Sequence, residues 1–254
     1  MSNTQVTLIQ IDNYGPWTVT PTPRREVDLQ TLQSRLFADL SQSFGMQDGY
    51  VFFTRFDNMV AITNGMDEED HARIQESIRN RYPVTVSLGI GHGADPAAAL
   101  VDATARLQEQ GSAQDESRTE ILRGQTLDED ERTDEDVQIA HYDVVDATGK
   151  YTDELDAFST FIEIEQGYAS LMRHLHDEHG SLAFFVGGDN VIAITSGMGR
   201  DDFEETIAFV HDDADVELQV GVGSGTTAHD AGMAAKHGLE ECREKGTRIE
   251  GVLQ

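Results

Sequence analysis

The chain has 254 residues, and its 47 acidic residues outnumber its 18 basic residues, which gives a formal net charge of −29. This composition lacks the basic stripe that a nucleic-acid partner requires, and the single cysteine, Cys242, excludes a disulfide framework and any zinc site built from several thiolates. No apolar run approaches the roughly 20 residues that span a bilayer, and the N-terminus lacks a signal-peptide pattern, so we expect a cytoplasmic protein without a membrane partner.

The first half of the chain alternates between strand and helix patterns. A strand that ends in Asp12 precedes an amphipathic helix, two short β-rich runs that meet at Asp57-Asn58, and a charged helix that opens near Asp67. A further strand and an alanine-rich helix follow. The expected strands cover 6–12 and 84–91, and the expected helices cover 26–43 and 95–109.

Residues 11–26, IDNYGPWTVTPTPRRE, connect the first strand to the first helix and contain the only tryptophan, Trp17, and the arginines Arg24 and Arg25. An aromatic ring beside prolines can stack a purine, and the arginines can hold phosphate. An ordinary rigid connection, with Pro23 leading into the helix, explains the same residues equally well. Both interpretations stay open.

Residues 111–136 become strongly acidic toward their end, and we expect a helical segment followed by a solvated linker. Beyond it the same succession of elements returns. A strand ending in Asp143 precedes a helix, two β-rich runs that meet at Asp189-Asn190, a charged helix that opens near Asp201, a strand and an alanine-rich helix. The expected strands cover 137–143 and 216–223, and the expected helices cover 153–177 and 227–244.

The two halves repeat at a nearly constant offset. VFFTRFDNMVAIT and AFFVGGDNVIAIT align with Asp57 and Asp189 132 positions apart, and the glycines of LGIGHG and VGVGSG keep that offset. The strand-ending residues Asp12 and Asp143 are 131 positions apart. A period this long indicates a duplicated domain rather than a solenoid of short repeats.

The β-α-β-β-α-β order predicts an α+β fold, namely two tandem ferredoxin-like, palm-type domains. Each would be an antiparallel sheet with helices on one face. We expect an N-terminal domain, a linker and a C-terminal domain at 1–110, 111–136 and 137–254.

The second hairpin, AFFVGGDNVIAIT, has the pattern of a site for a metal and a nucleotide. In this topology Asp143 at the end of the first strand should lie close to Asp189 at the hairpin, and two adjacent carboxylates need a cation to neutralise them. Mg²⁺ suits such a pair because it binds one or two carboxylates, water and phosphate. Gly187 and Gly188, which lack Cβ atoms, let phosphate oxygens approach the backbone beside Asn190.

A plain glycine-aspartate turn is the simpler alternative for GGDN. This alternative is less favoured because the first half carries a corresponding pair, Asp12 and Asp57, with Asn58 after Asp57. The first half has Arg55 and Phe56 in place of the two glycines, so one copy can bind the triphosphate while the other has diverged. We place the phosphates in the second copy.

Strand-end aspartate and a GGD hairpin on such a sheet resemble the palm-type domains of nucleotidyl and diguanylate cyclases and many polymerases. Four stretches of the first copy narrow the resemblance to one family, namely IQIDNYGPWTVTPTPRREVDLQTLQSRLFADL, FFTRFDNMVAITNGM, RIQESIRNRYPVTVS and GSAQDESR. Together with IAHYDVVDATGKYTD and FFVGGDNVIAITSGM in the second copy, they are similar to archaeal GTP cyclohydrolase III, also called GTP cyclohydrolase IIa. The similarity covers essentially the whole chain.

This resemblance implies an enzyme that opens the imidazole ring of GTP, retains the formyl group and releases two phosphates. The implied product is 2-amino-5-formylamino-6-ribosylamino-4(3H)-pyrimidinone 5′-phosphate, an entry to riboflavin and deazaflavin biosynthesis. The family resemblance also implies dependence on Mg²⁺, stimulation by K⁺ or another monovalent cation, and a homo-oligomer, a tetramer. From the residues themselves we hypothesise two-metal catalysis, in which the carboxylates of Asp143, Asp189, Asp12 and Asp57 hold two Mg²⁺ ions. The single Cys242 excludes a thiolate-bound zinc in their place.

Two other functions use the same architecture: a nucleotidyl cyclase that releases pyrophosphate, and a non-catalytic GTP-binding regulator. The strong acidity favours a halophilic protein, because at molar salt the Debye length falls to roughly 3 Å and self-repulsion largely vanishes. An acidic surface for a basic partner is the alternative.

Overall fold

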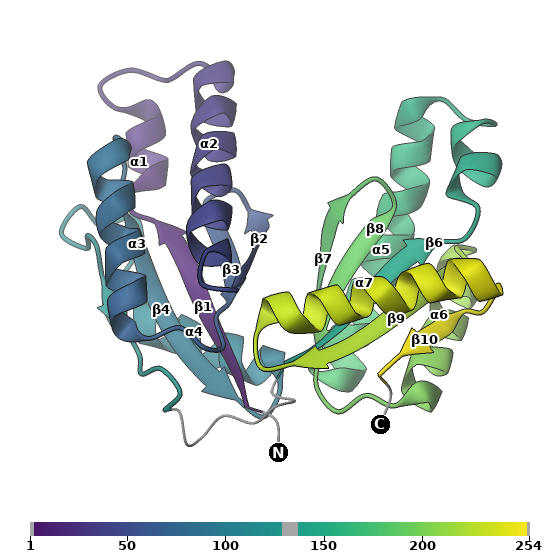
Figure 1. Ribbon diagram of the computed structural model, residues 1–254. Coiled ribbons are helices and arrows are strands. Elements are labelled where there is room, and N and C mark those ends of the chain that lie inside the picture. The colour runs from purple at the N-terminus through teal and green to yellow at the C-terminus, as the bar shows by residue number, and fades with distance from the viewer. Residues whose placement is uncertain (1–2, 129–136, 253–254) are drawn as a thin grey trace.

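The computed structural model describes residues 3–128 and 137–252, which form two units with the same order of elements (Figure 1). The first unit comprises β1 (Thr4–Ile11), α1 (Tyr14–Val19), α2 (Glu26–Gly45), β2 (Tyr50–Arg55), β3 (Asn58–Ile62), α3 (Glu68–Arg81), β4 (Val86–Gly93), α4 (Pro96–Gln108) and β5 (Leu122–Arg123). The second comprises β6 (Val137–Val144), a π-helical turn (Thr148–Thr152), α5 (Ala157–His179), β7 (Leu182–Gly187), β8 (Asn190–Thr195), α6 (Arg200–Ala214), β9 (Leu218–Gly225), α7 (Ala228–Lys245) and β10 (Ile249–Gly251).

The helices begin and end at residues that satisfy their terminal backbone groups. Asp67 caps α3 in a reciprocal capping box with Asp70, and Asp95 accepts from the Ala98 amide just before Pro96 opens α4. Gly180 and Gly246 take left-handed conformations after α5 and α7. These signals explain why the predicted helix boundaries lie within a few residues of the observed ones.

The strand order confirms the duplicated ferredoxin-like fold. The sheets run β2-β3-β1-β4-β5 and β10-β9-β6-β8-β7, and the four main strands of each sheet pair antiparallel. Each sheet gains a short parallel edge strand, β5 or β10, which the sequence pattern did not indicate.

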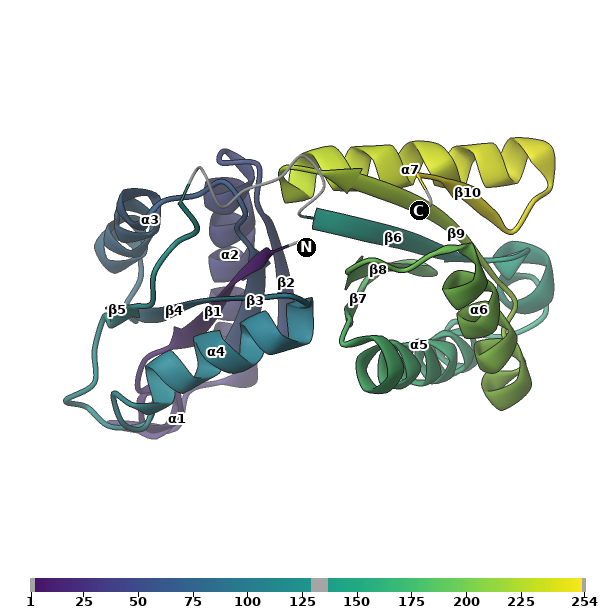
Figure 2. The ribbon, with the colours of Figure 1, turned by 90° about the horizontal axis from the view of Figure 1, so that it is seen from below.

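Helices cover both faces of each sheet, which extends the expected arrangement of helices on one face. In the first unit α2 and α3 pack on the face that carries Ile9 and Ile11, whereas α4 packs on the face that carries Val6 and Leu8. In the second unit α5 and α6 share one face, and α7 lies across β6 and β9 on the other (Figure 2).

The glycine repeats LGIGHG and VGVGSG make this extra helical layer possible. A Cβ atom on Gly91 would overlap the backbone of Ala103 in α4, and one on Gly223 would overlap the backbone of Ala231 and Ala235 in α7. Glycine in the strand and alanine in the helix therefore allow backbone to approach backbone closely.

The two units pack against each other through the sheet faces that carry α4 and α7 and through the edge strands β2 and β7. One apolar cluster contains residues of β1, β2 and α4 together with residues of β6, β7 and α7. At its centre the Phe52 and Phe184 rings stack with centroids 4.4 Å apart and an interplanar angle of 6°. The edge strands β2 and β7 thus face each other across the unit boundary.

The expected helical segment after 111 is not present in the described part of the linker. Residues 111–128 form turns and the strand β5, and Leu127 is buried and donates its amide to Gln5 Oε1 at 2.7 Å. The first unit therefore extends past residue 110 because this segment completes its sheet. The acidic end of the predicted linker, 129–136, lies outside the described residues. None of the described helices is long and apolar enough to cross a membrane.

Candidate active site

Asp143 stands at the end of β6, on the sheet face turned toward α7. It lies opposite Gln219 of β9, whose Nε2 donates to Asp143 Oδ2 at 2.8 Å. Arg243, in the last turn of α7, places its Nη2 2.9 Å from the same oxygen. Gln219 and Arg243 therefore hold this buried carboxylate through one oxygen, Oδ2.

Asp189 lies beside Asp143 at the tip of the β7–β8 hairpin. Burial raises the pKa of Asp189, and the negative charge of the neighbouring Asp143 raises it further. Asn190 Nδ2 donates to Asp189 Oδ1 at 3.1 Å, and Asn190 Oδ1 lies 3.0 Å from His141 Nε2. The topology thus brings the two carboxylates together as expected, while their role as metal ligands stays a prediction.

The two hairpin glycines are explained by the backbone conformation that they adopt, not by close packing against neighbouring atoms. Gly187 and Gly188 have φ values of 118° and 66°, a region that residues with a Cβ atom rarely occupy. A Cβ on Gly187 would meet no atom within 4 Å, so the tip is open space. The hairpin tip therefore presents Asp189 and exposed backbone beside Asp143 of β6.

The first unit does not repeat this carboxylate pair. Strand pairing places Gln10 opposite Ser87 and Asp143 opposite Gln219, and Ser87 and Gln219 are 132 positions apart. Gln10, not Asp12, is therefore the structural counterpart of Asp143. The prediction that Asp12 matches Asp143 is wrong by two residues.

Asp12 instead holds the first unit together. Its carboxylate is buried and accepts from Thr85 Oγ1 at 2.8 Å, Ser87 Oγ at 2.5 Å and the Glu120 amide at 2.9 Å. Asp57 forms an exposed ion pair with Arg55 at 3.4 Å. Three donors on Asp12 satisfy it without a metal ion, so the structure gives no support to Asp12 and Asp57 as a metal pair.

A buried arginine occupies the corresponding region of the first unit. Arg118 is 4% exposed and donates to Gln10 Oε1 at 2.8 Å, and Gln10 Nε2 donates to Asn58 Oδ1 at 2.9 Å. A neutral amide, Gln10, stands where the second unit has Asp143, and the Arg118 guanidinium donates to it.

The aromatic loop of the first unit forms the short helix α1. Arg24 lies over the Trp17 ring, 3.9 Å from its centroid, and Arg25 pairs with Asp28 at 2.8 Å at the start of α2. Trp17 and Asp12 help to line a cavity of about 290 Å³. Among the described residues, neither arginine bonds to the second hairpin, so the structure does not bring these predicted nucleotide contacts to Asp189.

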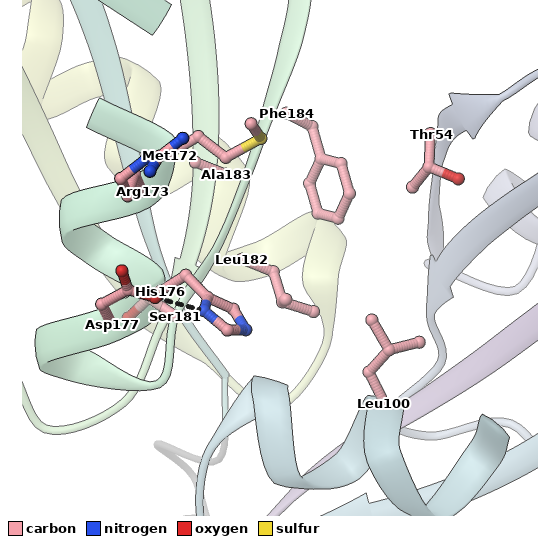
Figure 3. Close-up of a pocket in the computed structure, with 10 residues that line it drawn as sticks. All are labelled: Thr54, Leu100, Met172, Arg173, His176, Asp177, Ser181, Leu182, Ala183 and Phe184. Carbon is pink, nitrogen blue, oxygen red and sulfur yellow. Dashed lines mark hydrogen bonds and ion pairs between the residues drawn. The ribbon is translucent and has the colours of Figure 1, made fainter. Parts of the chain in front are cut away.

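A second cavity, of about 430 Å³, lies at the boundary between the units (Figure 3). Phe184 and Leu182 of β7 face Leu100 of α4 and Thr54 of β2 across it. Its lining is mainly apolar and includes neither Asp143 nor Asp189. This cavity therefore does not contain the carboxylates that the sequence predicts as metal ligands.

Sequence patterns did not reveal His141, Gln219 and Arg243. The strand register gives Gln219 once Asp143 is placed, and the two-residue period of a strand puts His141 on the same face as Asp143. Arg243 sits in a helix rich in charged residues, and only the packing of α7 singles it out.

The sequence comparisons show which family the chain belongs to. The family model described as GTP cyclohydrolase III matches residues 6–253. The chain is 69% identical over 250 residues to GTP cyclohydrolase III 1 of Halobacterium salinarum, covering 98% of both chains, and 50% identical to GTP cyclohydrolase III of Methanocaldococcus jannaschii, covering 95% of this chain and 88% of that one. A bacterial light-regulated adenylyl cyclase aligns over 97% of this chain and 84% of its own at 11% identity, with a TM-score of 0.38. The chain belongs to the GTP cyclohydrolase III family.

Proposed function

We propose that this protein is a hydrolase that opens the imidazole ring of GTP between C8 and N9 and releases two phosphates. The observation that carries the proposal is the family match over residues 6–253. The product would be 2-amino-5-formylamino-6-ribosylamino-4(3H)-pyrimidinone 5′-phosphate, which serves riboflavin and deazaflavin biosynthesis. The stoichiometry requires three waters, because ring opening with retention of the formyl group consumes one and the two phosphoanhydride bonds consume one each.

The donor set at the second hairpin fits Mg²⁺. Gln219 and Arg243 hold Oδ2 of Asp143, and the negative charge of Asp143 helps to raise the pKa of the neighbouring Asp189. A cation between the two carboxylates would remove this repulsion. Bound there, Mg²⁺ would neutralise phosphate charge and increase the acidity of a coordinated water.

The chain's own residues would position the substrate. The open hairpin tip at Gly187 and Gly188 leaves the backbone accessible to phosphate oxygens, as close approach without a Cβ requires. Asn190 links Asp189 to His141 and fixes the orientation of the carboxylate. Among the described residues, groups of three or more His, Cys, Asp or Glu side chains that could hold a metal ion are absent, so the remaining ligands would come from substrate and water.

Product identification tests the proposal. Purified protein is incubated with GTP, Mg²⁺ and molar KCl, and the products are identified by ultraviolet spectrum, mass and phosphate assay. We expect a ring-opened formamidopyrimidine monophosphate with two equivalents of inorganic phosphate. A cyclic nucleotide with pyrophosphate would refute the proposal and establish a cyclase, and unchanged GTP would favour a binding-only role.

We further propose that K⁺ stimulates the enzyme and that the active form is a homo-oligomer. Replacing KCl by NaCl or tetramethylammonium chloride at constant ionic strength should lower the rate, and an unchanged rate would refute the K⁺ proposal.

Light scattering in molar KCl should give a multiple of 28.0 kDa, and a mass of one chain would refute the oligomer.

A further inference from the structure

Lysine is scarce in this chain, and one of the lysines, Lys236, forms no ion pair with the described residues. The sequence has three, Lys150, Lys236 and Lys245. Lys150 pairs with Glu217 at 3.0 Å, and Lys245 pairs with Glu241 at 2.7 Å and Glu250 at 3.1 Å. Lys236 is exposed, and no acidic group among the described residues lies within ion-pair distance of it.

Lys236 stands on the face of α7 that is turned toward the second hairpin. Lys236, Glu240 and Arg243 are spaced four and three residues apart, which places them on one helical face. Arg243 reaches Asp143 from this face. Lys236 lies two turns earlier, roughly 10 Å along the helix axis. Its neighbour Ala235 packs against Gly221 of β9, which pairs with His141 of β6.

The position of this face is fixed by close packing. Gly221 and Gly223 of β9 bring the strand backbone against α7, where a Cβ atom would overlap Ala235 and Leu239. Figure 2 shows α7 lying along β9 and β6 on the side opposite α5 and α6. Lys236 is therefore held on the side of the sheet that carries His141 and Asp143, and its ammonium group has no ion-pair partner within residues 3–128 and 137–252.

We propose that Lys236 binds the terminal phosphates of the nucleotide, on the side of the second hairpin site that α7 closes. This inference rests on the proposed function, because it assumes a triphosphate beside Asp143 and Asp189. Arg243 is engaged by Asp143 and by Glu240 at 2.7 Å, so its positive charge is already offset. Lys236 supplies three free N–H donors, and a phosphate oxygen would complete them with charge-assisted hydrogen bonds.

A solvated lysine that only adds to solubility is the competing interpretation. It predicts that Lys236 and Lys245, which share α7, respond alike to loss of charge. A phosphate contact predicts a difference between them that depends on the number of phosphates in the ligand.

The experiment uses inorganic triphosphate with equimolar Mg²⁺ as a probe that reports binding without ring opening. Calorimetric titration of the full chain in molar KCl compares Lys236→Gln, Lys236→Arg and the control Lys245→Gln, each checked for folding by circular dichroism. Long-range attraction is screened in this salt, so only direct contacts contribute. We expect Lys236→Gln to weaken binding about tenfold, Lys236→Arg to restore most of it, and Lys245→Gln to match the wild type.

Wild-type affinity for triphosphate in Lys236→Gln, or equal losses in Lys236→Gln and Lys245→Gln, would overturn the inference. The product assay separates this outcome from failure of the proposed function. Wild-type protein that forms the ring-opened product while Lys236→Gln binds triphosphate normally refutes only the role of Lys236. Triphosphate binding that depends on Lys236, without any ring-opened product, refutes only the cyclohydrolase.

Discussion

Replacing Arg243 by alanine should destabilise the second unit through the carboxylate that it leaves behind. The Asp143 side chain is 7% exposed and the Arg243 side chain is 41% exposed. Removing one partner of a fully buried pair costs about 3–5 kcal/mol, whereas an exposed pair contributes about 0–1 kcal/mol. A buried carboxylate with a half-exposed partner lies between these limits, and Gln219 still donates to it, so we expect a loss of about 2 kcal/mol.

The assay is thermal unfolding by circular dichroism in molar KCl with chelator present. For a domain of 150–250 residues, 1 kcal/mol shifts Tm by about 2–4 °C, so Arg243→Ala should lower Tm by about 4–8 °C. The matched control is Arg248→Ala, which removes an ion pair with Glu217 whose side chains are 52% and 30% exposed and which high salt screens. Asp143→Asn combined with Arg243→Ala should recover most of the loss, because the uncompensated charge is then gone. If Arg243→Ala costs no more than Arg248→Ala, the reasoning is refuted.

Two further predictions concern the framework of the two units. Burial lowers the pKa of His71, which contacts Thr7 Oγ1 at 2.8 Å and the Asp67 carbonyl at 2.6 Å. The folded protein favours neutral His71, so the contribution of His71 to stability is present above the unfolded pKa of roughly 6.5 and is lost as pH falls below it. In His71→Gln the free energy of unfolding, measured with urea, should therefore depend less on pH between pH 6.5 and 5. An unaltered dependence on pH would contradict this. Gly223→Ala should lower the free energy of unfolding by about 1–3 kcal/mol or more, because the new Cβ overlaps the α7 backbone. The control Gly45→Ala has no atom within 4 Å of the new Cβ and should be neutral or stabilising by up to about 1 kcal/mol. Equal melting temperatures for the two variants would refute the packing argument.

The duplicated fold could be predicted from the sequence because its signals are local sequence patterns that occur in both halves of the chain. Alternation in the strands, capping aspartates before α3 and α4, and the conserved spacing between the two hairpins all specify the same arrangement. The strand-end position of Asp143 and the tip position of Asp189 follow from that topology, so their proximity was predictable. The short edge strands β5 and β10 were not, because two or three residues show no periodicity.

The misassignment of Asp12 has a physical cause. Shifting a strand by two residues keeps every side chain on the same face, so the alternating pattern of β1 is compatible with Asp12 or Gln10 as the counterpart of Asp143. The pairing of β1 with its neighbouring strands distinguishes them, since Ser87 of β4 lies opposite Gln10. The roles of Arg118 and Arg243 depend on tertiary packing of a turn segment and a helix, which no local pattern encodes.

The most direct test of the central claim is the rate of ring opening in Asp189→Asn compared with Asp57→Asn. Both changes replace a hairpin-tip carboxylate by an amide of the same shape, one in each unit, and both proteins are assayed with GTP, Mg²⁺ and molar KCl. We expect Asp189→Asn to lose at least about a hundredfold in kcat, a magnitude typical of a lost electrostatic contact to the transition state, and Asp57→Asn to stay within about threefold of the wild type, since single exposed ion pairs contribute little. Full activity in Asp189→Asn with loss of activity in Asp57→Asn would place the site in the first unit and contradict the account.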